Sequence, residues 1–99
     1  MPSQARKLSD LVGIGKAMLG DFKVLGVKDV EQLAAEDPLE LYERLCERTG
    51  QRHDICCLDV FRAAVAQARD PNLPAEQCQW WYWSRQRKRL EKSTPARYK

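Results

Sequence analysis

Residues 8–27 read LSDLVGIGKAMLGDFKVLGV, two short apolar segments joined by Gly13, Ile14 and Gly15. Two glycines with one apolar residue between them can turn the backbone through positive φ and leave amide N–H groups pointing outward at a helix start. Such a helix start attracts phosphate, because its free N–H groups and its dipole both favour an anion. This stretch therefore predicts two helices joined by a tight hairpin that can hold a phosphate.

The length of 99 residues has room for one domain with a modest core and leaves none for a second. We expect this domain to span residues 1–92. Residues 93–99, which begin Ser-Thr-Pro, are expected to fray.

Positive charge gathers at the two ends of the chain. Residues 1–28 carry five basic and two acidic side chains, residues 29–70 five and ten, and residues 71–99 seven and two. The ends, with net charges of +3 and +5, could meet in a patch for a polyanion while the middle, at −5, faces solvent or a partner. The alternative is an ordinary solvated surface.

Cysteine usage and hydropathy indicate in which cellular compartment the protein is expected. No run of about 18 apolar residues is present, so neither a membrane span nor an export signal is expected. In such a chain the four cysteines are expected to be reduced thiols that fill the core, which indicates a cytoplasmic protein. They are Cys46, Cys56, Cys57 and Cys78.

Capping signals predict an all-α fold of five to six short helices. The first two helices are expected over residues 5–12 and 16–25, the second ending at Gly26. Asp29 with Gln32 then opens a short helix, and Asp37-Pro38 opens a longer one that Gly50 ends.

The second half of the chain is predicted to hold the central core helix and an added C-terminal helix. Asp54 can cap the core helix, which continues to Arg69 and is stopped by the following Asp-Pro. After a rigid connector over residues 71–74, Glu76 is expected to begin the last helix, which runs to about residue 90.

A weak internal repeat is consistent with two hairpins. Gly13 matches Gly50 at an offset of 37, while Phe22 and Leu25 match Leu58 and Phe61 at an offset of 36. If the repeat is real, the fold is a pair of helix-hairpin-helix units, the second of them degenerate.

Several segments together resemble a bacterial helix-hairpin-helix family, whose members are called pathogenicity-locus or mitomycin-resistance proteins. The resemblance covers roughly residues 8–88, and the matching segments are Gly13-Ile14-Gly15, Leu25-Gly26-Val27, Asp37-Pro38, Leu41-Tyr42, Leu45-Cys46, Thr49 to Asp54, Leu58 to Arg62 and Trp80 to Trp83. It implies a small helical module that binds DNA or is associated with DNA repair.

The resemblance also implies a phosphate contact at the first hairpin. The amides around Gly13, Ile14 and Gly15 would hold a backbone phosphate, and Lys16 would add charge. Such hairpins usually have a proline before the first glycine and another after the second, followed by a Lys or Arg, a Ser or Thr, and a small alanine. In this chain those places hold Val12, Lys16, Ala17, Met18 and Leu19, so Lys16 is the polar group that remains for a phosphate contact.

The segment 85–92 carries five cations directly behind an aromatic cluster. These cations could bind the phosphates of a nucleic acid electrostatically while the aromatic rings stack on its bases. The helical spacing of Trp80 and Trp83 favours the alternative that the tryptophans pin the last helix to the core while the cations face water. The cations that we expect to contact phosphate are Arg85, Arg87, Lys88 and Arg89, joined by Arg52 from the second hairpin.

Metal and catalytic sites have little support. A zinc site at His53 and the nearby cysteines is disfavoured, since adjacent Cys56 and Cys57 point about 100° apart on a helix. Asp10, Asp21, Asp54 and Asp59 are explained by helix caps and solvated faces better than by magnesium. No catalytic pairing or nucleotide-binding loop is visible, so neither an enzyme nor a cofactor is expected.

The sequence therefore predicts a helix-hairpin-helix domain that binds duplex DNA through its phosphates without reading bases. The alternative is a protein-interaction adaptor with no DNA binding. Its docking surface would be the acidic face that includes Glu40, Glu43 and Glu47, or the aromatic patch near residues 80–83.

Overall fold

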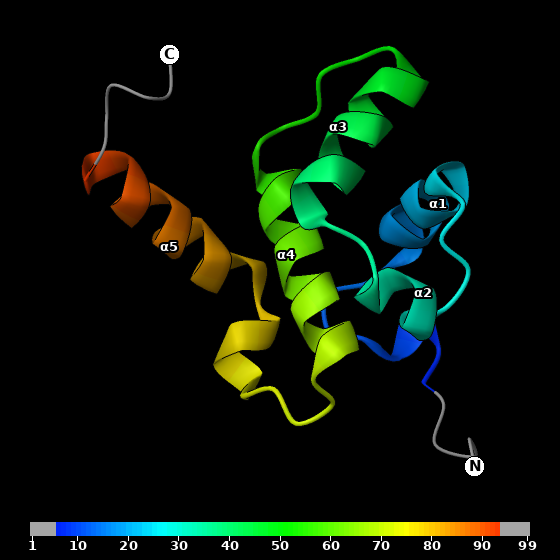
Figure 1. Ribbon diagram of the computed structural model, residues 1–99, viewed down its shortest axis with the longest axis horizontal. Coiled ribbons are helices and arrows are strands. Elements are labelled where there is room, and N and C mark those ends of the chain that lie inside the picture. The colour runs from blue at the N-terminus through cyan, green and yellow to red at the C-terminus, as the bar shows by residue number, and fades with distance from the viewer. Residues whose placement is uncertain (1–5, 94–99) are drawn as a thin grey trace.

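A computed structural model describes residues 6–93, of which 6–89 include the side chains, and this part of the chain is helical with no strand. Five α-helices and two short 3₁₀ helices follow one another (Figure 1). They are η2 (Leu8–Asp10), α1 (Lys16–Leu25), α2 (Val30–Ala34), α3 (Pro38–Thr49), α4 (Cys56–Arg69), η3 (Ala75–Cys78) and α5 (Trp80–Ser93). The all-α fold class is confirmed.

The caps of α2 and α3 agree with the sequence. The Asp29 carboxylate accepts the Gln32 amide at 2.7 Å, and the Gln32 side chain reaches back to the Lys28 amide at 2.9 Å. Asp37 accepts the Leu39 amide at 3.1 Å. α1 ends at Gly26 and α3 at Gly50, both in the left-handed conformation, as expected of helix stops.

Three expected helix starts are wrong in detail. The segment before Gly13 is a three-residue 3₁₀ turn, closed by the Asp10 carboxylate on the Lys7 amide, and no α-helix is present over residues 6–12. Asp54 does not cap α4 with its side chain; its backbone carbonyl accepts the Cys57 amide at 2.9 Å. The last helix is interrupted at Gln79, an extended residue that separates η3 from α5.

α4 is the centre of the molecule and lies between α3, α2 and α5 (Figure 1). It contributes Phe61 and Val65, each at most 1% exposed, and the Phe61 ring lies 5.9 Å from the ring of Phe22 in α1. Leu33, Leu41 and Leu45 complete the core from α2 and α3. Because one buried helix contacts nearly every other element, its polar side chains can connect distant parts of the chain.

Arginine side chains fasten the carboxyl ends of three helices. Arg48 donates to the Val24 carbonyl at 2.8 Å, Arg69 to the carbonyls of Ala34 and Glu36, and Arg6 to two carbonyls near the end of α4. Glu36 follows α2 outside the helix, and the other carbonyls belong to last turns, where they accept no hydrogen bond from within their own helix and the negative end of the helix dipole favours a cation. Several basic residues are therefore part of the fold.

The repeat suggested by the sequence stays a prediction. Gly13 and Gly50 both have positive φ, 82° and 69°, and Phe22 and Leu58 are both buried. The helices that precede the two glycines differ in length, however, with three residues in η2 and twelve in α3.

The expected fraying concerns residues that lie mostly outside the described part of the chain. Ser93, the one described residue in that range, is the last residue of α5. Within residues 6–93, no helix is long and apolar enough to cross a membrane.

Candidate functional site

The glycine turn, which we define as residues 11–15, changes direction at a single left-handed residue. Gly13 has a φ of 82°, a conformation that other residues rarely adopt. Gly15, with a φ of −104°, has ordinary extended backbone and is the N-cap of α1. Between them the half-buried Ile14 packs against the core, and its amide donates to the Leu11 carbonyl at 3.3 Å. The turn is thus anchored by its apolar residue.

Gln67 in α4 holds the turn in place. Its side-chain oxygen accepts the Val12 amide at 2.9 Å, and its side-chain nitrogen donates to the Val12 carbonyl at 3.0 Å. No motif in the sequence marks Gln67, which is only 4% exposed. The available signal was a glutamine between Val65 and Ala68 on the apolar stripe of the core helix, because a buried amide needs polar partners.

The start of α1 is left open. Gly15 provides no side chain to cap the helix, and the first turn of α1 contains no acidic residue. Gly15, Lys16 and Ala17 are exposed, and within residues 6–93 nothing hydrogen-bonds their backbone N–H groups. Three main-chain donors, the positive end of the helix dipole and the Lys16 ammonium therefore face solvent together.

Arg52 lies at the opposite end of α4 from the glycine turn. It is in the loop between α3 and α4, four residues before α4 begins at Cys56, whereas Gln67 holds the turn near the last residue of α4. At 1.5 Å per residue, Gln67 lies about 16 Å along the helix from Cys56. The structure therefore does not bring Arg52 and the glycine turn to a single point.

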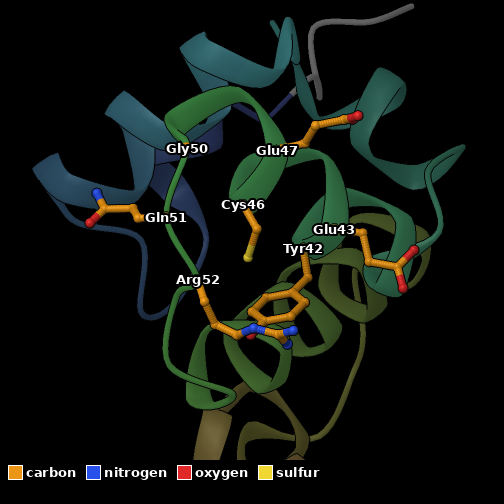
Figure 2. Close-up of a pocket in the computed structure, with 7 residues that line it drawn as sticks. All are labelled: Tyr42, Glu43, Cys46, Glu47, Gly50, Gln51 and Arg52. Atoms are coloured by element: carbon orange, nitrogen blue, oxygen red, sulfur yellow. The ribbon is translucent and has the colours of Figure 1, made fainter.

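Arg52 lines a shallow hollow on α3 of about 420 Å³ together with Tyr42, Glu43, Cys46, Glu47, Gly50 and Gln51 (Figure 2). In Figure 2 its side chain lies beside the Tyr42 ring. The Tyr42 hydroxyl donates to the His53 carbonyl at 2.6 Å, and burial raises the pKa of the phenol. A second hollow is lined by Glu40, Glu43, Arg44 and Glu47, so the acidic face of α3 borders both.

Arg87 is held by the fold. Its guanidinium contacts the Asp59 carboxylate at 3.1 to 3.3 Å, and the two side chains are 13% and 0% exposed. The expectation that this cation faces water is wrong, as is the expectation of a solvated Asp59. We therefore remove Arg87 from the candidate phosphate contacts, since it would leave a buried carboxylate unpaired if it turned outward.

Three further cations of α5, namely Arg85, Lys88 and Arg89, are exposed. Arg85 lies over the Trp81 ring, 4.6 Å from its centroid, and Lys88 and Arg89 follow on the same helix. Stacking on the ring restricts the guanidinium, which lowers the entropy cost of a contact with an anion.

The two tryptophans expected to pin α5 behave differently. The Trp83 indole donates to the Gln77 carbonyl at 2.8 Å and ties α5 to η3. Trp80 is 44% exposed and does not pin the helix, so the expectation is wrong for this residue.

The thiols near His53 lie between α1, α3 and α4. The His53 amide donates to the Cys46 sulfur at 3.3 Å, and the His53 ring contacts the Thr49 hydroxyl at 2.9 Å. Burial and the nearby Asp21 carboxylate raise the pKa of the Cys57 thiol. Across residues 6–93, no three His, Cys, Asp or Glu side chains converge as a metal site would require.

These features describe a small helical protein with an open, positively polarised helix start and a basic C-terminal helix. The chain belongs to the Cdd1 family, described as pathogenicity locus, whose model matches residues 2–89. It is 41% identical over 88 residues to a Streptomyces lavendulae protein named mitomycin resistance protein McrB, across 89% of this chain and 80% of that protein. No solved structure matches the chain.

Proposed function

We propose that the glycine turn and α1 form a helix-hairpin-helix that binds the phosphate backbone of duplex DNA without reading its sequence. The observation that carries this proposal is the open helix start, where the amides of Gly15, Lys16 and Ala17 are exposed beside an ammonium group. A phosphate oxygen can accept from such amides and is favoured by the helix dipole. Contacts of this kind fix position on DNA but carry no base information.

The exposed cations Arg85, Lys88 and Arg89 support the proposal from a second element. They add sequence-independent attraction to the polyanion, as does Arg52 at the far end of α4. The mitomycin resistance named for the Streptomyces relative extends the proposal to a role in DNA repair or the damage response.

The test distinguishes DNA binding by the open amides from a general effect of net charge on DNA affinity. Gly15→Asp places a carboxylate at the N-cap, where it accepts the helix amides and repels phosphate. Gly20→Asp adds the same charge at an exposed site in the same helix, where the new side chain has free space. Each variant is titrated against a labelled duplex at several salt concentrations.

We expect wild-type dissociation constants on the order of 100 μM or tighter at low salt, weakening steeply as salt rises. Gly15→Asp should weaken binding about tenfold, a loss of about 1.4 kcal/mol, and Gly20→Asp far less. Gly15→Asp should fold at least as stably as the wild type, because Asp is a better N-cap than Gly. Undetectable binding, or equal effects of the two variants, would refute the proposal.

The acidic face of α3 supports a second candidate, a protein-interaction adaptor without DNA binding. Glu43 and Glu47 border both hollows, which offer a basic partner a concave surface. Such a partner would be lost on Glu43→Lys with Glu47→Lys and unaffected by Gly15→Asp. Pull-down with the two variants distinguishes this surface from the glycine turn.

A further inference from the structure

Trp80, the first residue of α5, is an exposed aromatic residue. Its neighbours are engaged: Trp81 lies under Arg85, Tyr82 packs edge-on against Trp83 at 5.3 Å, and Trp83 donates a hydrogen bond. Among the residues that the structure describes, nothing forms a ring contact or hydrogen bond with the Trp80 indole, which is 44% exposed. The exposed part of the indole is therefore available to pack against a ligand.

The fold places Trp80 close to the glycine turn. The side-chain nitrogen of Gln67 lies 3.0 Å from the Val12 carbonyl oxygen and 3.5 Å from the Cys78 carbonyl oxygen. Val12 belongs to the glycine turn, and Cys78 is two residues before Trp80. Two residues span at most about 7.6 Å between Cα atoms, so Trp80 lies near the Val12 end of the glycine turn, and the first open amide follows three residues after Val12.

The surroundings favour nucleic acid over an apolar protein partner. Residues 71–89 carry four basic side chains and one acidic side chain, and α5 continues from Trp80 to exposed Arg85 and Lys88. Val12, 45% exposed on the glycine turn, adds a small apolar surface on the other side of Gln67. An aromatic face next to cations is the combination that holds single-stranded nucleic acid, with stacking for the bases and charge for the backbone.

We propose that Trp80 stacks on an unpaired base of a DNA strand whose phosphate is bound at the glycine turn. The preferred ligand is then duplex DNA with a single-stranded extension, because inside an intact duplex both faces of each base are already covered. This inference rests on the proposed function and adds to it the class of DNA that is preferred.

The experiment compares three ligands of one sequence: a blunt duplex, the same duplex with a short single-stranded overhang, and the single strand. Each is titrated against the wild type, Trp80→Ala, Trp80→Phe and Gly15→Asp. Leu39→Ala, which removes an equally exposed apolar side chain from α3, is the matched control. Thermal unfolding of Trp80→Ala checks that the fold is kept.

We expect the wild type to bind the overhang about tenfold more tightly than the blunt duplex. Trp80→Ala should lose this preference and keep its affinity for the blunt duplex, while Leu39→Ala should change neither. Trp80→Phe should keep most of the preference, since phenylalanine also stacks. In the wild type, the overhang should quench the fluorescence of Trp80. Trp80→Phe should lack this quenching, because it lacks the indole that is quenched.

The outcomes separate this inference from the proposed function. Equal wild-type affinity for overhang and blunt duplex overturns the role of Trp80, whereas a Gly15→Asp effect on both ligands still supports the phosphate site. Equal weakening of all three ligands by Trp80→Ala also overturns the stacking proposal. If Trp80→Ala weakens binding of the overhang and Gly15→Asp does not, the proposed phosphate site is refuted and the stacking contact is supported.

Discussion

A few residues at the glycine turn decide how the backbone runs there. Gly13 provides the left-handed turn, Ile14 the anchor in the core, and Gly15 the uncapped start of α1. Added Cβ atoms would meet nothing within 4 Å at either glycine, so only Gly13 requires glycine, for its φ of 82°. Gly15 matters for another reason: its lack of a side chain leaves the helix amides open.

Asp21 gives a residue-scale prediction about pH. Burial raises the pKa of this carboxyl group above its ordinary 3.8, and nearby His53 lowers it in part. A raised pKa means that the folded state binds the proton more tightly. The contribution of Asp21 to stability is therefore fully present below pH 3.8 and is lost as pH rises through its folded-state pKa.

Asp21→Asn should consequently raise the melting temperature at pH 7, and the difference should shrink as pH falls toward the ordinary pKa of the carboxyl group. Thermal unfolding between pH 3 and pH 8 measures this. Asp54→Asn, which removes the same charge at an exposed site, should show no such gain. A lower melting temperature for Asp21→Asn at pH 7 would contradict the prediction.

At the scale of elements, α5 is joined to α4 by a buried ion pair. Asp59 is completely buried, and Arg87 is its partner from the C-terminal helix. The sequence shows only an arginine in a basic segment and an aspartate in the first turn of a helix. Their pairing across 28 residues depends on how α5 lies against α4.

Removing one partner of this pair should strongly destabilise the fold. Arg87→Ala leaves a buried carboxylate uncompensated and should cost about 3 kcal/mol of unfolding free energy, measured by urea denaturation. Arg85→Ala, which removes an exposed cation, should cost far less. The double replacement Asp59→Leu with Arg87→Met should recover most of the loss. Equal costs for Arg87→Ala and Arg85→Ala would be inconsistent with this account.

At the scale of the whole molecule, Gln67 connects three distant segments. Its side chain contacts the glycine turn and the residues before α5, while its own carbonyl accepts from Arg6. A single buried amide in the central helix therefore joins the glycine turn to the segment that leads into α5. The proposed DNA surface depends on this junction and not on either element alone.

Gln67→Leu is the corresponding test. Loss of both hydrogen bonds to Val12 should cost about 1 to 2 kcal/mol of stability. It should also weaken DNA binding severalfold without any change in charge, because the open amides lose their fixed orientation. Gln51→Leu, at an exposed amide in the α3 to α4 loop, is the control. Unchanged DNA affinity in Gln67→Leu would show that the clamp does not position the site.

Local sequence signals were sufficient for much of the fold. The caps at Asp29 and Asp37, the stops at Gly26 and Gly50, and the apolar stripe of α4 all act within a few residues. The same rules failed at Asp54, where a backbone turn replaces the side-chain cap, and at Gln79, where the chain bends between η3 and α5.

The amino-acid sequence by itself determined the helical class, most helix ends and the open start of α1, because caps, glycines and periodicity are local. Only the tertiary structure decided which polar groups pair in the interior, with Arg87 bound to Asp59 and Gln67 bound to Val12. It also decided that Trp80 stays exposed. These depend on which helix faces meet, and residues far apart in the chain carry no local mark of their partners.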